Sequence, residues 1–427
     1  MKKIYNPVRA AWPEVLRRPT QTVADIEDTV SAIFKELKES GDATLRKYTE
    51  KFDGVVLTDL KVSEREIEEA KKLISEDLKK AIQLAKNNIE AFHEAQKTAK
   101  VEVETVSGVF CWQEKRPIQK VGLYIPGGTA PLFSTILMLA VPAAIAGCKE
   151  VVLCSPPNKE GKIHPAILFT AYLCGVTQIY KVGGIQAIAG MTFGTESIPQ
   201  VYKLFGPGNQ YVTVAKQIAT KYGVAIDMPA GPSELLVVAD DSANAGFVAS
   251  DLLSQAEHGV DSQVILVSTS KNLINLVEIE IEKQITSLPR KNIAERAIAN
   301  SKLIYVANDE AAIDLINAYG PEHYIVCVKN EDFYVENTMN AGSVFIGNYT
   351  PESAGDYASG TNHTLPTNGY AKQYSGVNLD SFMKSMTFQK ITAAGIKKIG
   401  SAIETMAEAE GLEAHKNAVT LRLNSLK

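Results

Sequence analysis

From Lys120 onward the chain alternates short apolar runs with helical stretches that open on glycine or proline. Apolar runs occur in a first series at 121–125, 151–154, 179–182 and 201–205, and in a second at 235–239, 264–267, 303–306, 324–327 and 344–346. Strands separated by one helix each are joined by right-handed crossovers and pair in parallel. The pattern therefore predicts an α/β protein with two parallel-sheet lobes. The two series share no residue-level repeat.

The length of 427 residues, 45% of them hydrophobic, fits more than one core, because single cores stop growing near ~250 to 300 residues. Before the first strand, amphipathic helices are expected over Thr22–Phe52 and Ser63–Lys100, with Ser63 and Glu66 forming a capping box. The apolar stripe of the second helix is Ile67, Ala70, Ile74, Leu78, Ala81 and Ala85. Beyond Asn378 the chain is predicted to be helical to its end.

Charge and cysteine content narrow the function classes. A formal charge of −5, with no basic run interleaved with aromatics, argues against nucleic acid as a partner. Five cysteines without a Cys-x-x-Cys pair do not form a disulfide framework, and Met1 is not followed by an apolar leader. We therefore expect a cytoplasmic protein. The uncharged segment from Val121 to Cys148 is interrupted by Pro131 and Pro142, which favours a buried core over a membrane span.

Four of the six histidines lie in short polar clusters, which are Gln255–His258, Glu322–His323, Asp356–His363 and Glu410–His415. Imidazole and carboxylate groups both bind zinc and both transfer protons near neutral pH. Residues 350–377 are irregular and rich in Gly, Ser, Thr, Asn and Pro, as functional loops often are. Taken singly, each cluster also fits a plainer interpretation, such as a helix end, a turn or a solvated helix face. Together they predict a metal-assisted acid/base site.

Three glycine-rich turns follow predicted strands, at Pro126-Gly127-Gly128, at Gly183-Gly184 and at Gly206-Pro207-Gly208-Asn209. Backbone N–H groups in such turns can bind a phosphate. None of the turns completes the spaced glycine fingerprint of a dinucleotide site or a P-loop. Spacing alone therefore does not predict a cofactor.

Several longer runs resemble the histidinol dehydrogenase family, and the resemblance extends from about residue 20 to the C-terminus. The runs are Tyr124-Ile-Pro-Gly-Gly-Thr-Ala-Pro-Leu-Phe-Ser-Thr, Phe205-Gly-Pro-Gly-Asn209, Asp227-Met-Pro-Ala-Gly-Pro-Ser-Glu234, Asp251-Leu-Leu-Ser-Gln-Ala-Glu-His258, Gly320-Pro-Glu-His323, Glu352-Ser-Ala-Gly-Asp-Tyr-Ala-Ser-Gly-Thr-Asn-His363 and His415-Lys-Asn-Ala-Val.

The resemblance implies a zinc-dependent, four-electron oxidation of L-histidinol to L-histidine through L-histidinal with two NAD+, the last steps of histidine biosynthesis. It assigns one Zn2+ per subunit to Gln255, His258, Asp356 and His415, and acid/base roles to Glu322 and His323. The implied substrate contacts are Ser233, Gln255, His258, His323, Asp356, His363, Glu410 and His415, and the implied NAD contacts are Tyr124, Gln186 and Asn209. Beside them, Ile185 stands where the family commonly has alanine.

The resemblance also implies a homodimer of two incomplete Rossmann-like lobes with small helical terminal segments. Its boundaries are an N-terminal segment 1–20, a first lobe of 21–119 with 233–377 that carries the metal and catalytic residues, a second lobe of 120–232 on the NAD side, and a helical tail 378–427 that completes the partner subunit's site.

Two other interpretations stay open at this point. In the first, a cysteine thiolate attacks the aldehyde as in aldehyde dehydrogenases, with Cys111, Cys148 or Cys154 as candidates. Cys148 and Cys154 flank a strand that looks buried, where cysteine is usually a small hydrophobic residue. In the second, the chain is a non-catalytic metal- or ligand-binding protein, which would leave Glu322 and His323 without a role.

Overall fold

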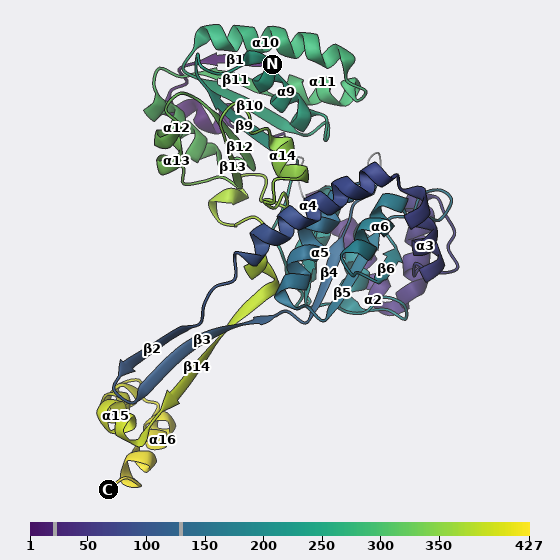
Figure 1. Cartoon of the computed structure of the whole chain (residues 1–427). Coiled ribbons are helices and arrows are strands. Elements are labelled where there is room, and N and C mark those ends of the chain that lie inside the picture. The colour runs from purple at the N-terminus through teal and green to yellow at the C-terminus, as the bar shows by residue number, and fades with distance from the viewer. Residues whose placement is uncertain (20–23, 128–130) are drawn as a thin grey trace. The chain divides into compact units, whose positions relative to one another are not determined.

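The computed structural model describes residues 1–19, 24–127 and 131–427. These residues form two compact units, one of Met1–Gln96 with Gln119–Phe382 and one of Lys97–Ile118 with Met383–Lys427. The first unit contains two parallel sheets, as the alternating pattern predicts (Figure 1). The mixed α/β class expected from the sequence is confirmed.

The larger sheet has six parallel strands in the order β1-β11-β10-β9-β12-β13. Its strands are β1 Lys2–Tyr5, β9 Glu234–Ala239, β10 Gln263–Ser268, β11 Lys302–Tyr305, β12 His323–Cys327 and β13 Ser343–Ile346. Every residue of β9, β10 and β12 is buried, because helices cover both faces. Leu235 and Val237 pack in one core, and Leu236 and Val238 pack in the core on the opposite face.

The helices of this lobe are α9 Ala245–Ala256, α10 Lys271–Gln284, α11 Lys291–Ala299, α12 Asp309–Tyr319, α13 Glu331–Asn337 and α14 Glu352–Tyr357. In Figure 1, α10 and α11 lie on one side of the sheet, and α12 and α13 lie on the other. Short turns of helix occur at η1 Arg9–Ala11, α1 Trp12–Val15, η2 Ile285–Ser287, η3 Tyr370–Lys372 and η4 Leu379–Phe382.

The smaller sheet has five parallel strands in the order β6-β5-β4-β7-β8. Its strands are β4 Lys120–Tyr124, β5 Glu150–Ser155, β6 Gln178–Lys181, β7 Lys203–Phe205 and β8 Ala225–Ile226, and its helices are α5 Ser134–Ala146, α6 Pro165–Leu173, α7 Gly184–Phe193 and α8 Gln210–Thr220. All nine strands predicted from the apolar runs are therefore confirmed, whereas β1 and β8 were not predicted.

The membrane-span interpretation of the uncharged segment is excluded by the burial of α5, whose apolar residues pack around Pro142 in the protein core. None of the helices in the described ranges combines the length and the apolar character needed to cross a bilayer.

The N-terminal helices are α2 Ala24–Asp53, α3 Glu64–Leu73 and α4 Glu76–Glu94. The predicted start of the first helix at Thr22 lies outside the described residues. Helix α2 packs on α7 and α8, α3 on α6, and α4 on α5. These contacts are with the five-stranded lobe, which differs from the expected grouping of residues 21–119 with residues 233–377. The reason is physical: an apolar helix stripe reveals that a face is buried but not which sheet covers it.

The predicted single helix over Ser63–Lys100 is two helices. The capping box of Ser63 and Glu66 is confirmed. Ile74 takes an extended conformation, and Ser75 then caps α4 by accepting a hydrogen bond from the backbone N–H of Leu78. The break resets the helical phase, so Ala81 is exposed and Ile82 is buried in its place.

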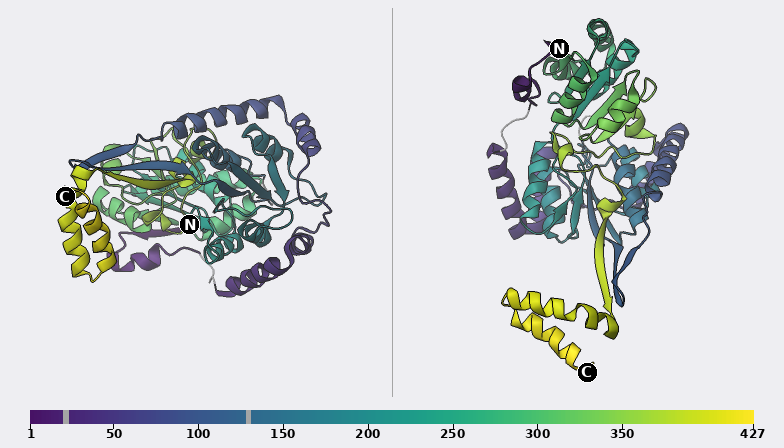
Figure 2. Two further views of the ribbon diagram at one scale, coloured as in Figure 1. Left: turned by 90° about the horizontal axis from the view of Figure 1, so that it is seen from below. Right: turned by 90° about the vertical axis from the view of Figure 1, so that its left-hand side faces the viewer.

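The second unit is an antiparallel sheet in the order β14-β3-β2, with strands β2 Val101–Val106, β3 Val109–Pro117 and β14 Met383–Ile391, followed by α15 Ala393–Ala409 and α16 Glu413–Asn424. The helices α15 and α16 pack side by side in both views of Figure 2. The prediction of helix from Asn378 to the end is therefore wrong for β14. This strand pairs along its whole length with β3, and Phe388 stacks on its cross-strand neighbour Trp112.

Candidate active site and metal centre

The candidate catalytic residues lie at the amino ends of two neighbouring strands. Glu322 and His323 stand at the start of β12, and Ser233 precedes β9, whose Leu235 is the register partner of His323. Because α9 runs antiparallel to the strands, its C-terminal end brings Gln255 to the same edge of the sheet. The site therefore forms at the edge opposite to the carboxyl edge where parallel α/β sheets usually bind ligands.

Glu322 is held by the strand beside it. Its Oε2 accepts a 2.7 Å hydrogen bond from the backbone N–H of Glu234, and the side-chain amide group of Gln255 lies 3.4 Å away. The Glu234 side chain is in turn paired with Arg18, whose Nη2 lies 2.9 Å from Glu234 Oε2. The guanidinium group also stacks over the ring of Tyr319 at 3.9 Å. A buried chain of contacts therefore fixes the Glu322 carboxylate.

His323 is buried, and its two ring nitrogens have different surroundings. Nδ1 lies 3.3 Å from the carbonyl oxygen of Glu234, a group that can only accept, so this contact favours a proton on Nδ1. Nε2 is buried, lacks a hydrogen-bond partner among the described residues, and lies 3.6 Å from Asp356 Oδ1. In the neutral imidazole, this arrangement leaves the Nε2 lone pair free to take a proton from a bound molecule.

Carboxylates dominate the electrostatics around His323. Burial opposes its protonation, but the charges of Glu352 and Glu322 outweigh burial and raise the pKa of His323 well above the ordinary value of 6.5. Burial likewise raises the pKa of Glu352 to about 8. The acidic neighbours of His323 therefore favour its protonated form, and a divalent cation bound to Asp356 would oppose that effect and favour the neutral imidazole that can act as a base.

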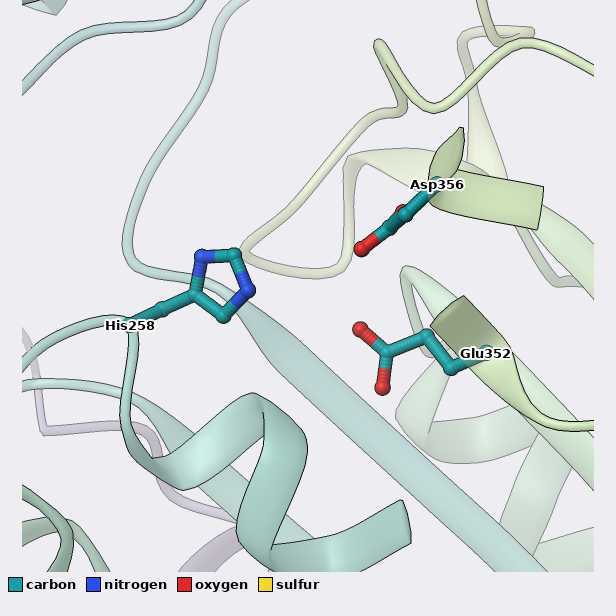
Figure 3. A group of neighbouring side chains, drawn as sticks. All are labelled: His258, Glu352 and Asp356. Carbon is teal, nitrogen blue, oxygen red and sulfur yellow. The ribbon is translucent and has the colours of Figure 1, made fainter. Parts of the chain in front are cut away.

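A candidate cation site lies beside these residues. One donor atom from each of His258, Glu352 and Asp356 falls within 4.8 Å of the others, and all three side chains point toward a common space in Figure 3. Glu352 and Asp356 lie one turn apart on α14, and His258 follows the C-terminal end of α9. Imidazole and carboxylate are ordinary zinc ligands, so this donor set fits a divalent cation.

The surroundings of the Gln255 side chain also fit a bound divalent cation. Its side-chain oxygen faces Glu352 Oε1, and two facing oxygens without a donor between them are unfavourable. Turning the amide over resolves the contact, because its nitrogen then donates to Glu352 and its oxygen accepts from the Glu234 N–H at 3.2 Å. A cation shared by Gln255 and Glu352 resolves it equally well. The predicted ligands Gln255, His258 and Asp356 are therefore brought together by the fold.

His363 joins this group from the irregular loop. Its Nδ1 lies 2.9 Å from the backbone oxygen of Asp356, and its Nε2 lies 3.2 Å from the Thr135 hydroxyl of α5. Burial lowers the pKa of His363, so its imidazole is neutral at neutral pH. Glu410 and His415 belong to the second compact unit, where both are exposed.

The predicted NAD contacts lie at the carboxyl edge of the five-stranded sheet. Tyr124 and Asn209 line a cavity of about 900 Å³, together with Ile185, Asp53 and other residues. The Tyr124 hydroxyl accepts a 3.1 Å hydrogen bond from the Gly184 N–H, and Asn209 caps α8. Of the glycine-rich turns, Gly127 and Gly184 line the cavity, whereas Gly128 lies outside the described residues.

Gln186 differs from Tyr124 and Asn209 in that its side-chain amide is buried without a partner among the described residues. It is 1% exposed, and both polar atoms of its amide lack hydrogen-bond partners within the described ranges. A buried amide that stays unpaired is costly, but Gln186 is not among the residues that line the cavity, although its neighbours Gly184 and Ile185 are.

The thiols of Cys148 and Cys154 have raised pKa values, which argues against a nucleophilic role. Burial raises the pKa of Cys148 to about 12 and raises that of Cys154 further. Thiols so strongly protonated at neutral pH are poor nucleophiles, because the thiolate is the reactive form. Cys111 lies on β3 in the second unit. The geometry therefore disfavours the thiolate mechanism.

Three residues of the site were not singled out from the sequence, namely Arg18, Glu234 and Glu352. Glu352 could have been found from its spacing of four from Asp356, which places both carboxylates on one helix face. No local signal connects Arg18 to Glu234, because their contact joins segments 216 residues apart.

Comparisons with known proteins identify the family of this chain. A family model described as histidinol dehydrogenase matches residues 16–423. Histidinol dehydrogenase from Bacteroides thetaiotaomicron is 59% identical over 427 residues, covering 100% of both chains. The enzyme of that name from Escherichia coli K12 is 52% identical over 417 residues, covering 97% of this chain and 95% of its own.

Among solved structures, the crystal structure of histidinol dehydrogenase from Elizabethkingia anophelis superposes with a TM-score of 0.98 at 56% identity, covering 100% of this chain and 98% of the other. The family model, the identity over the full length and the shared fold agree, and the chain therefore belongs to the histidinol dehydrogenase family.

Proposed function

We propose that this protein oxidises L-histidinol to L-histidine through L-histidinal, using two NAD+ in succession and one zinc ion per subunit, in the final steps of histidine biosynthesis. The observation that carries the proposal is the pairing of Glu322 with His323, whose free Nε2 lies 3.6 Å from a carboxylate of the candidate cation site. A proton acceptor next to a cation site is what oxidation of a chelating amino alcohol requires.

Gln255, His258 and Asp356 would hold the zinc ion, together with His415 of the partner subunit. When bound, zinc supplies a fixed charge that grips the imidazole and amine of the substrate and so positions its alcohol carbon. The substrate contacts would be these same residues with Ser233, His323, His363 and the partner subunit's Glu410.

His323 would act in both oxidations. In the first, Nε2 takes the hydroxyl proton as a hydride leaves the alcohol carbon for NAD+, which gives the aldehyde and NADH. Glu322 then takes a proton from a water molecule as that water adds to the aldehyde, and His323 gives the proton from the first step to the aldehyde oxygen. The hydrate is then complete, and Nε2 of His323 can accept a proton again. His323 takes a proton from the resulting hydrate while a second hydride leaves for a second NAD+, which gives the carboxylate.

The cavity beside Tyr124, Gln186 and Asn209 would hold NAD+. Its volume of about 900 Å³ lies in the upper range of small-molecule sites. Gln186, whose amide is unpaired among the described residues, follows Gly184 and Ile185 of the cavity wall on α7 and would approach the cofactor from there. Ile185, buried in the wall of this cavity, would shape the fit of the cofactor.

Formation of NADH from histidinol tests the proposal. The purified protein is expected to form two NADH per histidinol, to lose activity with a chelator and to regain it with Zn2+. Absence of turnover in the zinc-loaded protein would favour a non-catalytic binding protein. Retained turnover in a variant with all five cysteines replaced would remove the thiolate alternative.

A shared site in a cytoplasmic homodimer is the remaining part of the proposal. His258→Asn and His415→Asn variants should each be inactive. Mixed dimers of the two variants should recover part of the activity, because one of their two sites would contain both natural histidines. Failure of mixing to restore activity in proven mixed dimers would place His415 in its own subunit's site.

A further inference from the structure

Lys216 on α8 is a buried cation in the NAD-side lobe. It is 2% exposed, and its ammonium group is paired with the carboxylate of Asp227, whose side chain is 1% exposed. Neither residue lines the cavity. Buried ion pairs are weak evidence for stability, because hydrophobic residues of similar volume often stabilise a fold equally well. Stability alone therefore does not explain why an ion pair is buried at this position.

Both members of the pair bind the backbone of one glycine. Lys216 Nζ donates to the carbonyl oxygen of Gly206 at 2.9 Å, and the Gly206 N–H donates to Asp227 Oδ2 at 2.8 Å. Asp227 Oδ1 also accepts a 2.7 Å hydrogen bond from the Met228 N–H. The lysine and the aspartate thus form a closed ring around Gly206, and hydrophobic replacements could not supply these hydrogen bonds.

The backbone of Gly206 has an unusual conformation and lies close to Tyr124. Its φ is +130°, a backbone conformation that favours glycine, and a Cβ atom there would collide with the carbonyl oxygen of Tyr124. The chain continues through Pro207 and Gly208 to Asn209, which caps α8. The ring therefore sets how the 206–209 turn lies against Tyr124, and Tyr124 and Asn209 both line the cavity.

We propose that Lys216 and Asp227 are positioning residues for cofactor binding, which clamp Gly206 against Tyr124 so that Tyr124 and Asn209 face the cavity in their binding geometry. This inference rests on the proposed function, because it assumes that NAD+ occupies the cavity. The clamp orders the turn before the cofactor arrives, and loss of such preorganisation is expected to weaken binding.

The test compares Lys216→Met and Asp227→Asn with Asp42→Asn in the zinc-loaded full-length protein. Asp42 is a matched control: it is a buried carboxylate of the same lobe that accepts hydrogen bonds from Ser197, away from the cavity. We expect both clamp variants to raise the dissociation constant of NADH and the KM for NAD+ about tenfold, with kcat and the histidinol KM within about twofold. Asp42→Asn should lower Tm without changing NADH binding.

Amide hydrogen exchange gives a second readout. The segment 205–212 should exchange faster in the clamp variants, while β5 and β6 stay protected. If Lys216→Met does not fold, Asp227→Asn decides, because it keeps an oxygen for the Gly206 N–H while it removes the ion pair and the hydrogen bond from the Met228 N–H. Unchanged NADH affinity with a lowered Tm in the clamp variants would overturn the proposed positioning role of Lys216 and Asp227. A wild-type protein that does not bind NADH would instead overturn the proposed function.

Discussion

The backbone N–H of Glu234 donates a 2.7 Å hydrogen bond to Oε2 of Glu322, so the strand β9 holds the carboxylate that precedes His323 on β12. Glu234 contributes twice to this region, since its carbonyl oxygen also lies 3.3 Å from Nδ1 of His323. One residue of the central strand thus orients both proposed acid/base groups.

Replacement of Glu322 by glutamine should separate the two oxidations. The amide oxygen introduced by Glu322→Gln can still accept from the Glu234 N–H, so the fold and His323 stay in place, but the side chain can no longer take a proton from water. Aldehyde oxidation should fall about 100-fold or more, and alcohol oxidation should fall much less. NADH formation measured separately with histidinol and histidinal checks this.

The control is Glu310→Gln, which changes an exposed carboxylate on α12 of the same lobe and should leave both half-reactions unchanged. Equal losses of the two half-reactions in Glu322→Gln would contradict a specific role for Glu322 in adding water.

Arg18→Met should destabilise the protein strongly. The pair it forms with Glu234 is nearly buried, with side chains 15% and 3% exposed, and removal of one partner leaves an uncompensated buried charge. Such losses cost about 3 to 5 kcal/mol of unfolding free energy. Arg17→Met is the matched control, because its pair with Glu14 is more than two-thirds exposed on both sides and should contribute about 1 kcal/mol or less.

Denaturant unfolding of the two arginine variants measures the difference. A double variant in which Glu234 is also replaced by glutamine should recover part of the lost stability, because the unpaired carboxylate is then absent. Similar losses for Arg17→Met and Arg18→Met would show that burial of the Arg18 pair has no special effect.

The parts of the fold that could be predicted are those encoded by local patterns. The runs around Leu235–Ala239 and Val264–Val267 predict buried parallel strands because helices on both faces require apolar residues throughout. The strand β14 was missed because its residues are mostly exposed and polar, and its pairing with β3 joins segments more than 260 residues apart in sequence. Local patterns contain no information about such partners.

Some contacts of the candidate site could also be predicted from local sequence, whereas others could not. The proximity of Gln255 and His258 could be predicted from their spacing of three near a helix end, although His258 lies just beyond α9, and that of Glu322 and His323 follows from adjacency. The approach of α14 to the end of α9 is a tertiary contact, which is why Glu352 was not predicted as a member of the cation site. The motif resemblance located Asp356, but not the oxygen contact between Glu352 and Gln255.

Glu352→Gln should weaken metal binding. Glu352 contributes a carboxylate oxygen to the group with His258 and Asp356 and contacts Gln255. Loss of a charged neighbour of metal ligands typically weakens affinity about 10- to 100-fold. Competition with a chromophoric chelator measures the Zn2+ dissociation constant. Glu257→Gln is the control, because it removes a carboxylate next to His258 that is not part of the group. An unchanged dissociation constant for Glu352→Gln would exclude Glu352 from the cation site.

Asp251→Asn should stabilise the protein in a pH-dependent manner. Asp251 is 8% exposed on α9, and burial raises its pKa to about 7, against roughly 3.9 in an unfolded chain. Below about pH 4 the carboxyl group is protonated in both states and costs nothing. As pH rises from 4 to 7, only the unfolded chain ionises, so the natural protein loses stability, and above pH 7 the loss is complete.

Asparagine does not ionise and avoids this loss. The variant should therefore exceed the natural protein in stability at pH 8, by on the order of 3 kcal/mol, and the advantage should shrink toward pH 5. Thermal unfolding of both proteins across this range measures the effect, with the exposed Asp332→Asn as a control that should show no trend with pH. A stability difference that stays constant from pH 5 to pH 8, or a variant less stable at pH 8, would mean that Asp251 ionises normally in the folded protein.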